Sequence, residues 1–293
     1  MRPITLPPKR IAVLVLLSSA LLAGFISTTR ASTTGSAPTA PDLVFQSDRD
    51  GNVEIYAMRS DGHLQRRLTV EPGVDRDPTV SPSGLVAFAS DRGGDLDIFV
   101  MNGEGRATTR LTHFEGDETQ PAFSPDGSKL AFVHGDDVFV MNANGSQLQN
   151  VTDHAGADAD PAWAPDGRHL AFASDRGGSQ EIFAMRLGSR RAVALTRSGD
   201  NSTPDWSTDG SRIAFAHVDE IRLVSPRGGY ETAVASGFSD PSFSPDGAEL
   251  AVADGKDVIL VSLVNRSRIN LSFSAAIDSA PDWRTQGKHQ RSP

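Results

Sequence analysis

Short apolar runs separated by turn-forming residues follow one another along most of the chain. Between residues 124 and 145, Ser-Pro-Asp-Gly leads into Leu130, Phe132 and Val133, Gly-Asp-Asp interrupts this run, and a second apolar run at 138–141 ends at an Asn-Gly turn. Such alternation between turn residues predicts β-hairpins. The 3.6-residue apolar period of an amphipathic helix is absent from these stretches. The pattern therefore predicts an all-β fold.

The same pattern repeats along the chain at a nearly constant interval. Similar stretches lie at 43–69, 81–105, 164–189, 207–229 and 244–267. The prolines that open the units are spaced by 37 to 43 residues and stand at Pro78, Pro121, Pro161, Pro204, Pro241 and Pro281. A period near forty residues with about four short strands per unit is typical of a β-propeller.

The first unit lacks its Pro-aromatic strand, and residues 279–288 supply such a strand at the other end of the sequence. A ring of blades can close without a free sheet edge if the C-terminal strand completes the first blade. We therefore expect a six-bladed β-propeller of four-stranded antiparallel blades that closes in this way. The recurring aromatic position after each proline, such as Trp163 and Trp283, is expected to pack between blades.

The units resemble the TolB-type propeller repeats, also called PD40 or WD40-like repeats. Residues 158–186, DADPAWAPDGRHLAFASDRGGSQEIFAMR, match the pattern D-x-x-P-x-W-S-P-D-G-x-x-I-A-F-x-S-D-R-x-G-x-x-D-I-Y-x-M-N nearly throughout, and the resemblance covers about 41–287. It implies the fold and says little about function, because propellers host many unrelated activities. TolB itself carries an α/β domain before its propeller, and this sequence has no room for one between its first thirty residues and residue 43. The resemblance thus implies a propeller-only relative.

The N-terminal residues have the composition of an export signal. The first thirty residues contain no acid, and Lys9 and Arg10 precede an apolar stretch at 11–26 that small residues follow. A cleaved signal peptide and an uncleaved signal anchor over 1–30 both remain open. We expect a Ser/Thr/Pro-rich linker at 31–41, the propeller at 42–287 and a disordered tail at 288–293. The protein is then exported, to the periplasm, the cell envelope or the extracellular space, and contacts a membrane only through an uncleaved N-terminal segment.

Charge and composition exclude several functions. Residues 1–30 carry four positive charges and no negative ones, so without them the formal net charge falls from −9 to −13. An acidic domain is a poor binder of nucleic acid or anionic lipid. The sequence has no cysteine, which excludes thiol catalysis and cysteine-ligated metal centres. It also has no G-x-S-x-G motif of a serine hydrolase.

Acidic residues three positions before the opening prolines form the first candidate site. They are Asp75, Glu118, Asp158 and Asp278, with Asn201 in the fifth copy, while Phe238 departs from the pattern. Each lies where the chain enters an innermost strand, so we expect them at one mouth of the central channel. Crowded carboxylates there favour Ca²⁺, which makes calcium the expected cofactor if there is one. The alternative is that each acid only caps its own loop through backbone N–H groups.

The longest and most acidic loops form the second candidate site. Strand alternation places the connections at 112–121 and 152–161 on the same face as the Ser-Asp-Arg-Gly-Gly loops. Because rigid scaffolds usually carry function on variable loops, we expect the binding face there, including His113, Asp117, His154 and Asp158.

Two functions remain open. The first is a non-catalytic, monomeric, exported propeller that binds a protein, peptide or glycan on its acidic long-loop face and requires no cofactor. The alternative is a metal-dependent propeller enzyme, of the lactonase or sugar lyase type, that acts at the channel mouth. Such chemistry needs a metal with an open position and a placed base, and the sequence offers acids but no His-carboxylate cluster. We therefore favour binding.

Overall fold

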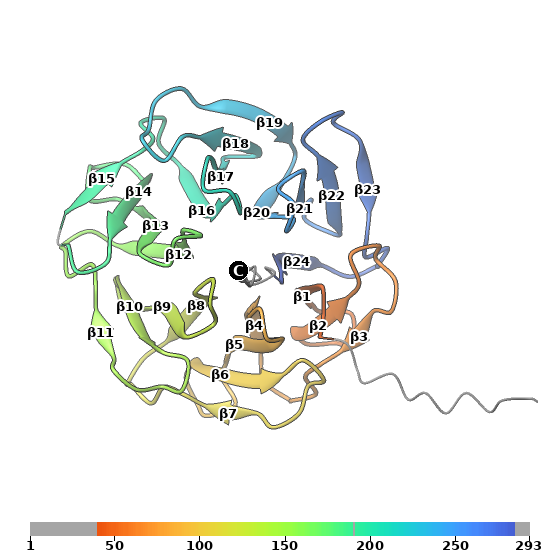
Figure 1. Cartoon of the computed structure of the whole chain (residues 1–293). Helices are drawn as coiled ribbons and strands as arrows, with labels where there is room; N and C mark the ends of the chain where they lie inside the picture. The colour runs from red at the N-terminus through yellow and green to blue at the C-terminus, as the bar shows by residue number, and fades with distance from the viewer. Residues whose placement is uncertain (1–39, 190, 285–293) are drawn as a thin grey trace, which may run out of the picture. The chain divides into compact units, whose positions relative to one another are not determined.

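The repeats form six four-stranded antiparallel sheets, here called blades, which stand around a common axis (Figure 1). The computed structural model describes residues 40–189 and 191–284. From axis to rim, blade 1 contains β24 (Asp278–Trp283), β1 (Leu43–Ser47), β2 (Glu54–Met58) and β3 (Arg66–Arg67). Blade 2 contains β4 (Asp75–Val80), β5 (Leu85–Ser90), β6 (Asp97–Asn102) and β7 (Thr109–Arg110). Blade 3 contains β8 (Glu118–Phe123), β9 (Lys129–His134), β10 (Asp137–Asn142) and β11 (Gln149–Asn150).

The remaining three blades repeat this order. Blade 4 contains β12 (Asp158–Trp163), β13 (His169–Ser174), β14 (Glu181–Arg186) and β15 (Ala192–Ala194). Blade 5 contains β16 (Asn201–Trp206), β17 (Ile213–His217), β18 (Glu220–Val224) and β19 (Thr232–Ser236). Blade 6 contains β20 (Ser239–Phe243), β21 (Glu249–Ala253), β22 (Val258–Ser262) and β23 (Arg268–Asn270).

The ring closes where the two ends of the propeller meet. β24 pairs with β1 in antiparallel register, with Leu43 opposite Trp283 and Ser47 opposite Asp278. The first blade is thus built from both ends of the sequence, and no strand of the described chain remains unpaired at the axis. The predicted six-bladed fold and its closure by the C-terminal strand are confirmed.

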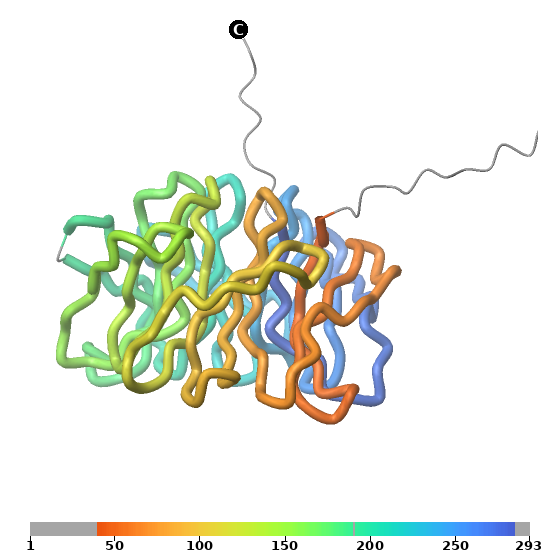
Figure 2. The backbone as a smooth tube through the Cα atoms, turned by 90° about the horizontal axis from the view of Figure 1, so that it is seen from below, coloured from red at the N-terminus to blue at the C-terminus, as the bar shows by residue number. Residues whose placement is uncertain are grey.

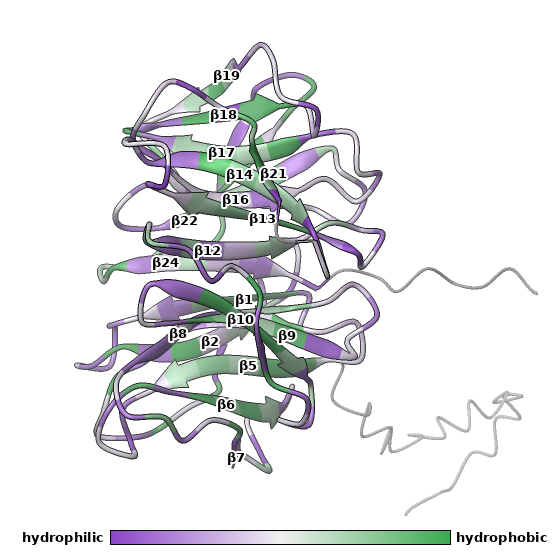
Figure 3. Ribbon diagram, turned by 90° about the vertical axis from the view of Figure 1, so that its left-hand side faces the viewer, coloured by the Kyte–Doolittle hydropathy of each residue, from purple (hydrophilic) through white to green (hydrophobic). Residues whose placement is uncertain are grey.

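The hydrophobic core lies between neighbouring blades. The second strands of five blades each contribute a phenylalanine without solvent exposure, namely Phe45, Phe88, Phe132, Phe172 and Phe215. At one interface, Val44 and Ile55 of blade 1 pack with Val80 and Phe88 of blade 2. Burying each such side chain contributes about 1.5–3 kcal/mol. Figure 3 shows the result, in which apolar strand segments are joined by polar loops.

The loops gather on two opposite faces of the blades, which Figure 2 shows edge-on. The turn face carries the tight turns between first and second strands, at 81–84, 124–128, 164–168, 207–212 and 244–248. The long-loop face carries the loops between second and third strands and the connections from each blade to the next.

Within residues 40–189 and 191–284 we find no helix of the length and apolarity needed to cross a membrane. The predicted export signal, the linker up to residue 39 and the tail at 288–293 lie outside the described residues.

Candidate functional site

The four acids expected at a channel mouth lie buried inside their own blades. Asp75, Glu118 and Asp278 have 0% exposure and Asp158 has 1%. Three of them each face the arginine that follows the second strand of the same blade. The distances from Arg Nη2 to the carboxylate are 2.9 Å for Arg92 and Asp75, 2.7 Å for Arg176 and Asp158, and 2.8 Å for Arg49 and Asp278.

Each of these arginines also packs on aromatic rings. In blade 4 the Arg176 guanidinium lies 5.0 Å from the centre of the Phe172 ring and 5.3 Å from that of Phe183. Its Nε donates to Ser174 Oγ at 2.9 Å. A desolvated cation over an aromatic face is stabilised by the ring quadrupole. We call this unit of acid, arginine, serine and two rings the arginine clamp; it holds the first three strands of a blade together.

In two blades a histidine stands at the position of the clamp serine, the last residue of the second strand, and itself faces the acid or amide. In blade 3, His134 Nδ1 lies 2.8 Å from Glu118 Oε1, and its ring stacks on Phe114 with the centroids 4.6 Å apart. In blade 5, His217 Nδ1 lies 3.0 Å from Asn201 Oδ1. Both histidines thus contact the first residue of the innermost strand, and His134 also packs on an aromatic ring as the arginines do. The two blades are not adjacent.

The structure therefore places these acids inside their own blades rather than as a ring that faces the channel mouth, and calcium as the cofactor stays a prediction. A buried carboxylate needs a cationic partner, and the clamp arginines supply it within each blade. Among the described residues no group of three or more His, Asp or Glu side chains could hold a metal ion. The alternative, that each acid serves its own blade, is closer to the structure, although the principal partner is an arginine rather than backbone N–H groups.

The other predicted residues remain on the long-loop face but do not converge. His113, Asp117 and His154 are exposed. Asp117 Oδ1 accepts the Leu96 N–H at 3.0 Å, and His154 Nδ1 accepts the Gly156 N–H at 3.0 Å, so both support loop conformations. The structure also contains a large cavity that the sequence analysis did not predict. None of these three side chains lines it.

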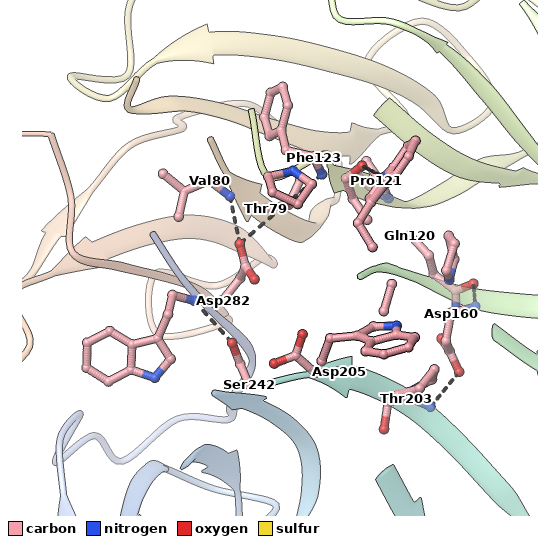
Figure 4. Close-up of a pocket in the computed structure, with 18 of the residues that line it drawn as sticks. Thr79, Val80, Gln120, Pro121, Phe123, Asp160, Thr203, Asp205, Ser242 and Asp282 are labelled. Carbon is pink, nitrogen blue, oxygen red and sulfur yellow. Dashed lines mark hydrogen bonds between the residues drawn. The ribbon is translucent and has the colours of Figure 1, made fainter. Parts of the chain in front are cut away.

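This cavity, of about 740 Å³, lies on the axis between the six innermost strands (Figure 4). The six opening prolines and their neighbours form its wall. Turn residues of blades 3, 4 and 5, among them Pro125, Asp166 and Thr208, also line it, so the cavity extends to the turn face. We call it the axial cavity.

One ring of wall positions, here called the deep ring, is formed by the residue before each proline. Its members are Asp77, Gln120, Asp160, Thr203, Asp240 and Ala280, all with φ between 46° and 53°. This left-handed conformation is strained for residues with a side chain. In this conformation several of these side chains reach the next blade and accept hydrogen bonds from its backbone N–H groups.

The deep-ring hydrogen bonds pass from blade to blade. Asp77 accepts the Gln120 N–H at 3.3 Å, Gln120 Oε1 accepts the Asp160 N–H at 3.0 Å, and Asp160 accepts the Thr203 N–H at 3.0 Å. The deep-ring residue of blade 1 is Ala280, whose side chain cannot accept a hydrogen bond. Gln46 Oε1, from the second strand of the same blade, accepts the Asp77 N–H of blade 2 at 2.8 Å instead. Backbone N–H groups that would otherwise face a buried surface are thus satisfied.

A second ring, here called the shallow ring, lies after the prolines and nearer the turn face. It consists of Thr79, Ala122, Ala162, Asp205, Ser242 and Asp282. Asp205 accepts the Phe243 N–H at 2.7 Å, and Asp282 accepts the Val80 N–H at 2.8 Å. Ser242 Oγ accepts the Trp283 N–H at 3.2 Å (Figure 4). Both rings therefore join neighbouring blades around the axis.

Five aspartates make the wall of the axial cavity negative. Three belong to the deep ring, Asp77, Asp160 and Asp240, and two to the shallow ring, Asp205 and Asp282. Asp126 and Asp166 also line the cavity, from the turns, and Arg168 at the turn face is the one cation among the described lining residues. Burial raises the pKa of Asp160 to about 6, with further increases from the charges of Asp240 and Asp77. Burial also raises the pKa of Asp205 and of Asp282 to about 7. The cavity therefore becomes more negative as the pH rises from 5 to 8.

Ionisation of Asp282 opposes folding, so Asp282→Asn should stabilise the protein at alkaline pH. The folded-state pKa of about 7 exceeds the ordinary pKa of an aspartate, 3.8. The stability that this group contributes is therefore fully present below pH 3.8 and is lost as the pH rises to 7. Asparagine keeps an oxygen for the Val80 N–H and does not ionise. Relative to wild type, the variant should gain about 2 kcal/mol between pH 5.5 and pH 8, at 1.36 kcal/mol per unit. Denaturant unfolding at both pH values measures this gain.

The exposed Asp61→Asn replacement is the matched control for this experiment, because Asp61 lies on a turn outside the cavity. The effect of Asp61→Asn on the free energy of unfolding should be nearly the same at pH 5.5 and pH 8. An Asp282→Asn gain that is equal at pH 5.5 and pH 8 would refute the buried-charge explanation.

Comparisons with known proteins agree with this geometry. A family model for PD40, the TolB beta propeller domain, matches residues 27–136 and 106–240. None of the curated proteins compared matches the sequence. TolB from Acinetobacter baumannii superimposes with a TM-score of 0.73 and 24% identity, over 83% of this chain and 67% of that chain. For a putative TolB from Agrobacterium tumefaciens the TM-score is 0.65 at 18% identity, over 81% of this chain and 90% of the other.

A third neighbour comes from the structure of a nidogen/laminin complex, with a TM-score of 0.66 and 13% identity over 83% of this chain and 98% of that chain. At such identities these structural likenesses show the fold alone. The two segments that match the family model together span 27–240, well over half of the 293 residues, and they contain the repeats opened by Pro78, Pro121, Pro161 and Pro204. The chain therefore belongs to the TolB β-propeller family, PD40.

Proposed function

We propose that this protein is an exported, non-catalytic propeller of the cell envelope that binds a protein partner at its turn face, with the axial cavity at the centre of the binding surface. The observation that carries the proposal is the cavity, which combines proline and tryptophan walls with a few convergent polar groups. This is the usual composition of a binding pocket.

A protein partner, rather than a small molecule alone, is favoured by two considerations. The cavity extends to the turn face, so a segment of a partner can enter it while the partner rests on the surrounding turns. One neighbour with this fold comes from a complex of two proteins, nidogen and laminin. Export rests on the predicted signal at 1–30, and we retain the prediction of a monomer that requires no cofactor.

The choice of face differs from the expectation based on loop length. The long-loop face carries His113, Asp117 and His154, but Asp117 and His154 already support their own loops. The cavity and the excess of aspartates over cations in its wall both favour the turn face. The long-loop face, with a peptide or glycan as partner, is the second candidate surface.

Metal-dependent catalysis has less support than binding. Such an enzyme holds its metal with about three protein ligands and keeps one position open. The described residues offer no group of three candidate ligands, and the predicted acids are paired with arginines or a histidine.

Site-specific photo-crosslinking in the native host tests the proposed function. A photoreactive phenylalanine replaces Thr208, at the rim of the axial cavity, or His113, on the long-loop face. We expect one dominant protein adduct from position 208 and none from position 113. Adducts from position 113 alone would move the binding site to the other face, and the absence of protein adducts from both positions would overturn the proposal.

A further inference from the structure

We propose that the axial cavity receives the side chain of a lysine from the partner polypeptide. This inference rests on the proposed function and identifies the group that the cavity recognises. It starts from an imbalance of charge: seven aspartates line the cavity, five of them in the two rings, and the one lining cation, Arg168, lies at the turn face. Asp160, Asp205 and Asp282 accept backbone N–H groups from neighbouring blades, and these bonds add no positive charge. Asp77 has a cationic partner in Arg76, whose Nε lies 3.7 Å from Asp77 Oδ2.

The placement of the deep-ring aspartates favours a compact cation on the axis. Asp77, Asp160 and Asp240 come from blades 2, 4 and 6, so they alternate with the uncharged Gln120, Thr203 and Ala280 around the ring. A lysine ammonium has three N–H donors and no acceptor, which suits three acceptors spread around an axis, either directly or through water. The planar guanidinium of arginine suits a single carboxylate better.

The walls above the deep ring suit the aliphatic part of lysine. Trp163, Trp206 and Trp283 all line the cavity together with the six prolines. The lining runs from the deep ring past the shallow ring to the turn face, so a side chain that enters from the turn face passes both rings. The four methylene groups would lie against apolar wall while the ammonium reaches the deep ring, as lysine side chains commonly do at such boundaries.

A further polar group in the deep ring lacks a partner. Thr203 Oγ1 is buried and makes no hydrogen bond with the described residues. Calcium is a poorer occupant, since it requires six to eight oxygen ligands at 2.3–2.6 Å. No group of three candidate metal ligands exists among the described residues.

Tryptophan fluorescence of the purified full chain can test this inference, because its three tryptophans all line the cavity. The probe is the peptide acetyl-Gly-Gly-Lys-Gly-Gly-amide at pH 7.5, compared with the same peptide carrying acetyl-lysine, norleucine or arginine. We expect a saturable change with the lysine peptide, at least tenfold weaker binding of the acetyl-lysine and norleucine peptides, and several-fold weaker binding of the arginine peptide. Affinity should fall from pH 7.5 to pH 5.5.

Two variants test the deep ring separately. Asp160→Asn and Asp240→Asn each remove a charge and keep an acceptor oxygen, and each should weaken the lysine peptide at least tenfold. Asp61→Asn, away from the cavity, should leave the affinity unchanged. A melting temperature for each variant confirms folding, and the second variant serves if the first is unstable.

Several results would overturn the inference. Equal binding of the norleucine peptide would make the cavity a purely apolar site. Binding of free 1,5-diaminopentane without binding of the lysine peptide would make a polyamine the ligand. If position 208 still crosslinks a partner while the lysine peptide fails to bind, the lysine inference fails and the proposed function stands, whereas loss of the crosslink refutes the proposed function itself.

Discussion

Arg176→Met should destabilise the protein by about 3–5 kcal/mol, because it leaves the buried Asp158 carboxylate without its cation. Asp158 has 1% exposure and both of its oxygens lie 2.7 Å from Arg176 Nη2. Methionine retains much of the aliphatic volume between Phe172 and Phe183, so the loss should come from the unpaired charge rather than from a cavity. Denaturant unfolding at pH 7 measures the difference.

The double variant Arg176→Met, Asp158→Asn separates charge from packing. It removes both charges and should recover at least half of the lost stability. Arg186→Met, at an exposed position of the same blade, is the control and should change stability by about 0.5 kcal/mol or less. A loss below about 1 kcal/mol for Arg176→Met would mean that the clamp is not the structural unit described above.

The fold could be predicted because the same sequence features recur in nearly every unit. The opening prolines, the buried phenylalanines and the turn residues recur with one period, and an error in one copy is corrected by the others. The closure was predictable for the same reason: the first unit lacks a strand that residues 279–288 contain. In the structure β24, from the C-terminal end of the propeller, pairs with β1 and supplies the strand that the first unit lacks.

The candidate site was not predictable in the same way, because side-chain direction within the innermost strand depends on local backbone geometry. Asp75 and Asp77 are two residues apart and both acidic, yet Asp75 faces Arg92 inside blade 2 and Asp77 lines the axial cavity. Asp77 has a φ of 53°, and the β4–β5 register shifts between Arg76 and Thr79. Ordinary strand alternation, on which the sequence argument relied, does not hold across such an irregularity.

The aspartates of the two rings contribute both to the stability of the propeller and to the charge of the axial cavity. They hold the blades together by accepting N–H groups from the next blade, and the same carboxylates give the cavity its charge. Because ionisation of Asp205 and Asp282 opposes folding near neutral pH, a bound cation would relieve repulsion that the empty cavity retains. Binding of a cationic group should therefore raise the melting temperature more at pH 8 than at pH 5.5.

Removal of residues 278–293 should abolish cooperative folding. β24 supplies the innermost strand of blade 1, and its loss exposes β1 along the axis. It also removes Trp283, which has 4% exposure, the Asp278 partner of Arg49 and the Asp282 acceptor of the Val80 N–H. The loss of a buried tryptophan alone costs about 3–5 kcal/mol, and total stabilities are typically about 5–15 kcal/mol.

The shortened chain should accordingly lack a sigmoidal thermal transition in far-ultraviolet circular dichroism, whereas truncation after Arg284, which keeps all of β24, should retain it. A synthetic peptide of residues 276–288 added to the shortened chain should restore the transition, because the missing strand contacts blades 1, 2 and 6 through bonds that do not require chain continuity. A shortened chain that unfolds at the wild-type temperature would show that five complete blades and one incomplete blade suffice. The seam would then contribute little to stability, and closure of the ring would have to serve the binding surface instead.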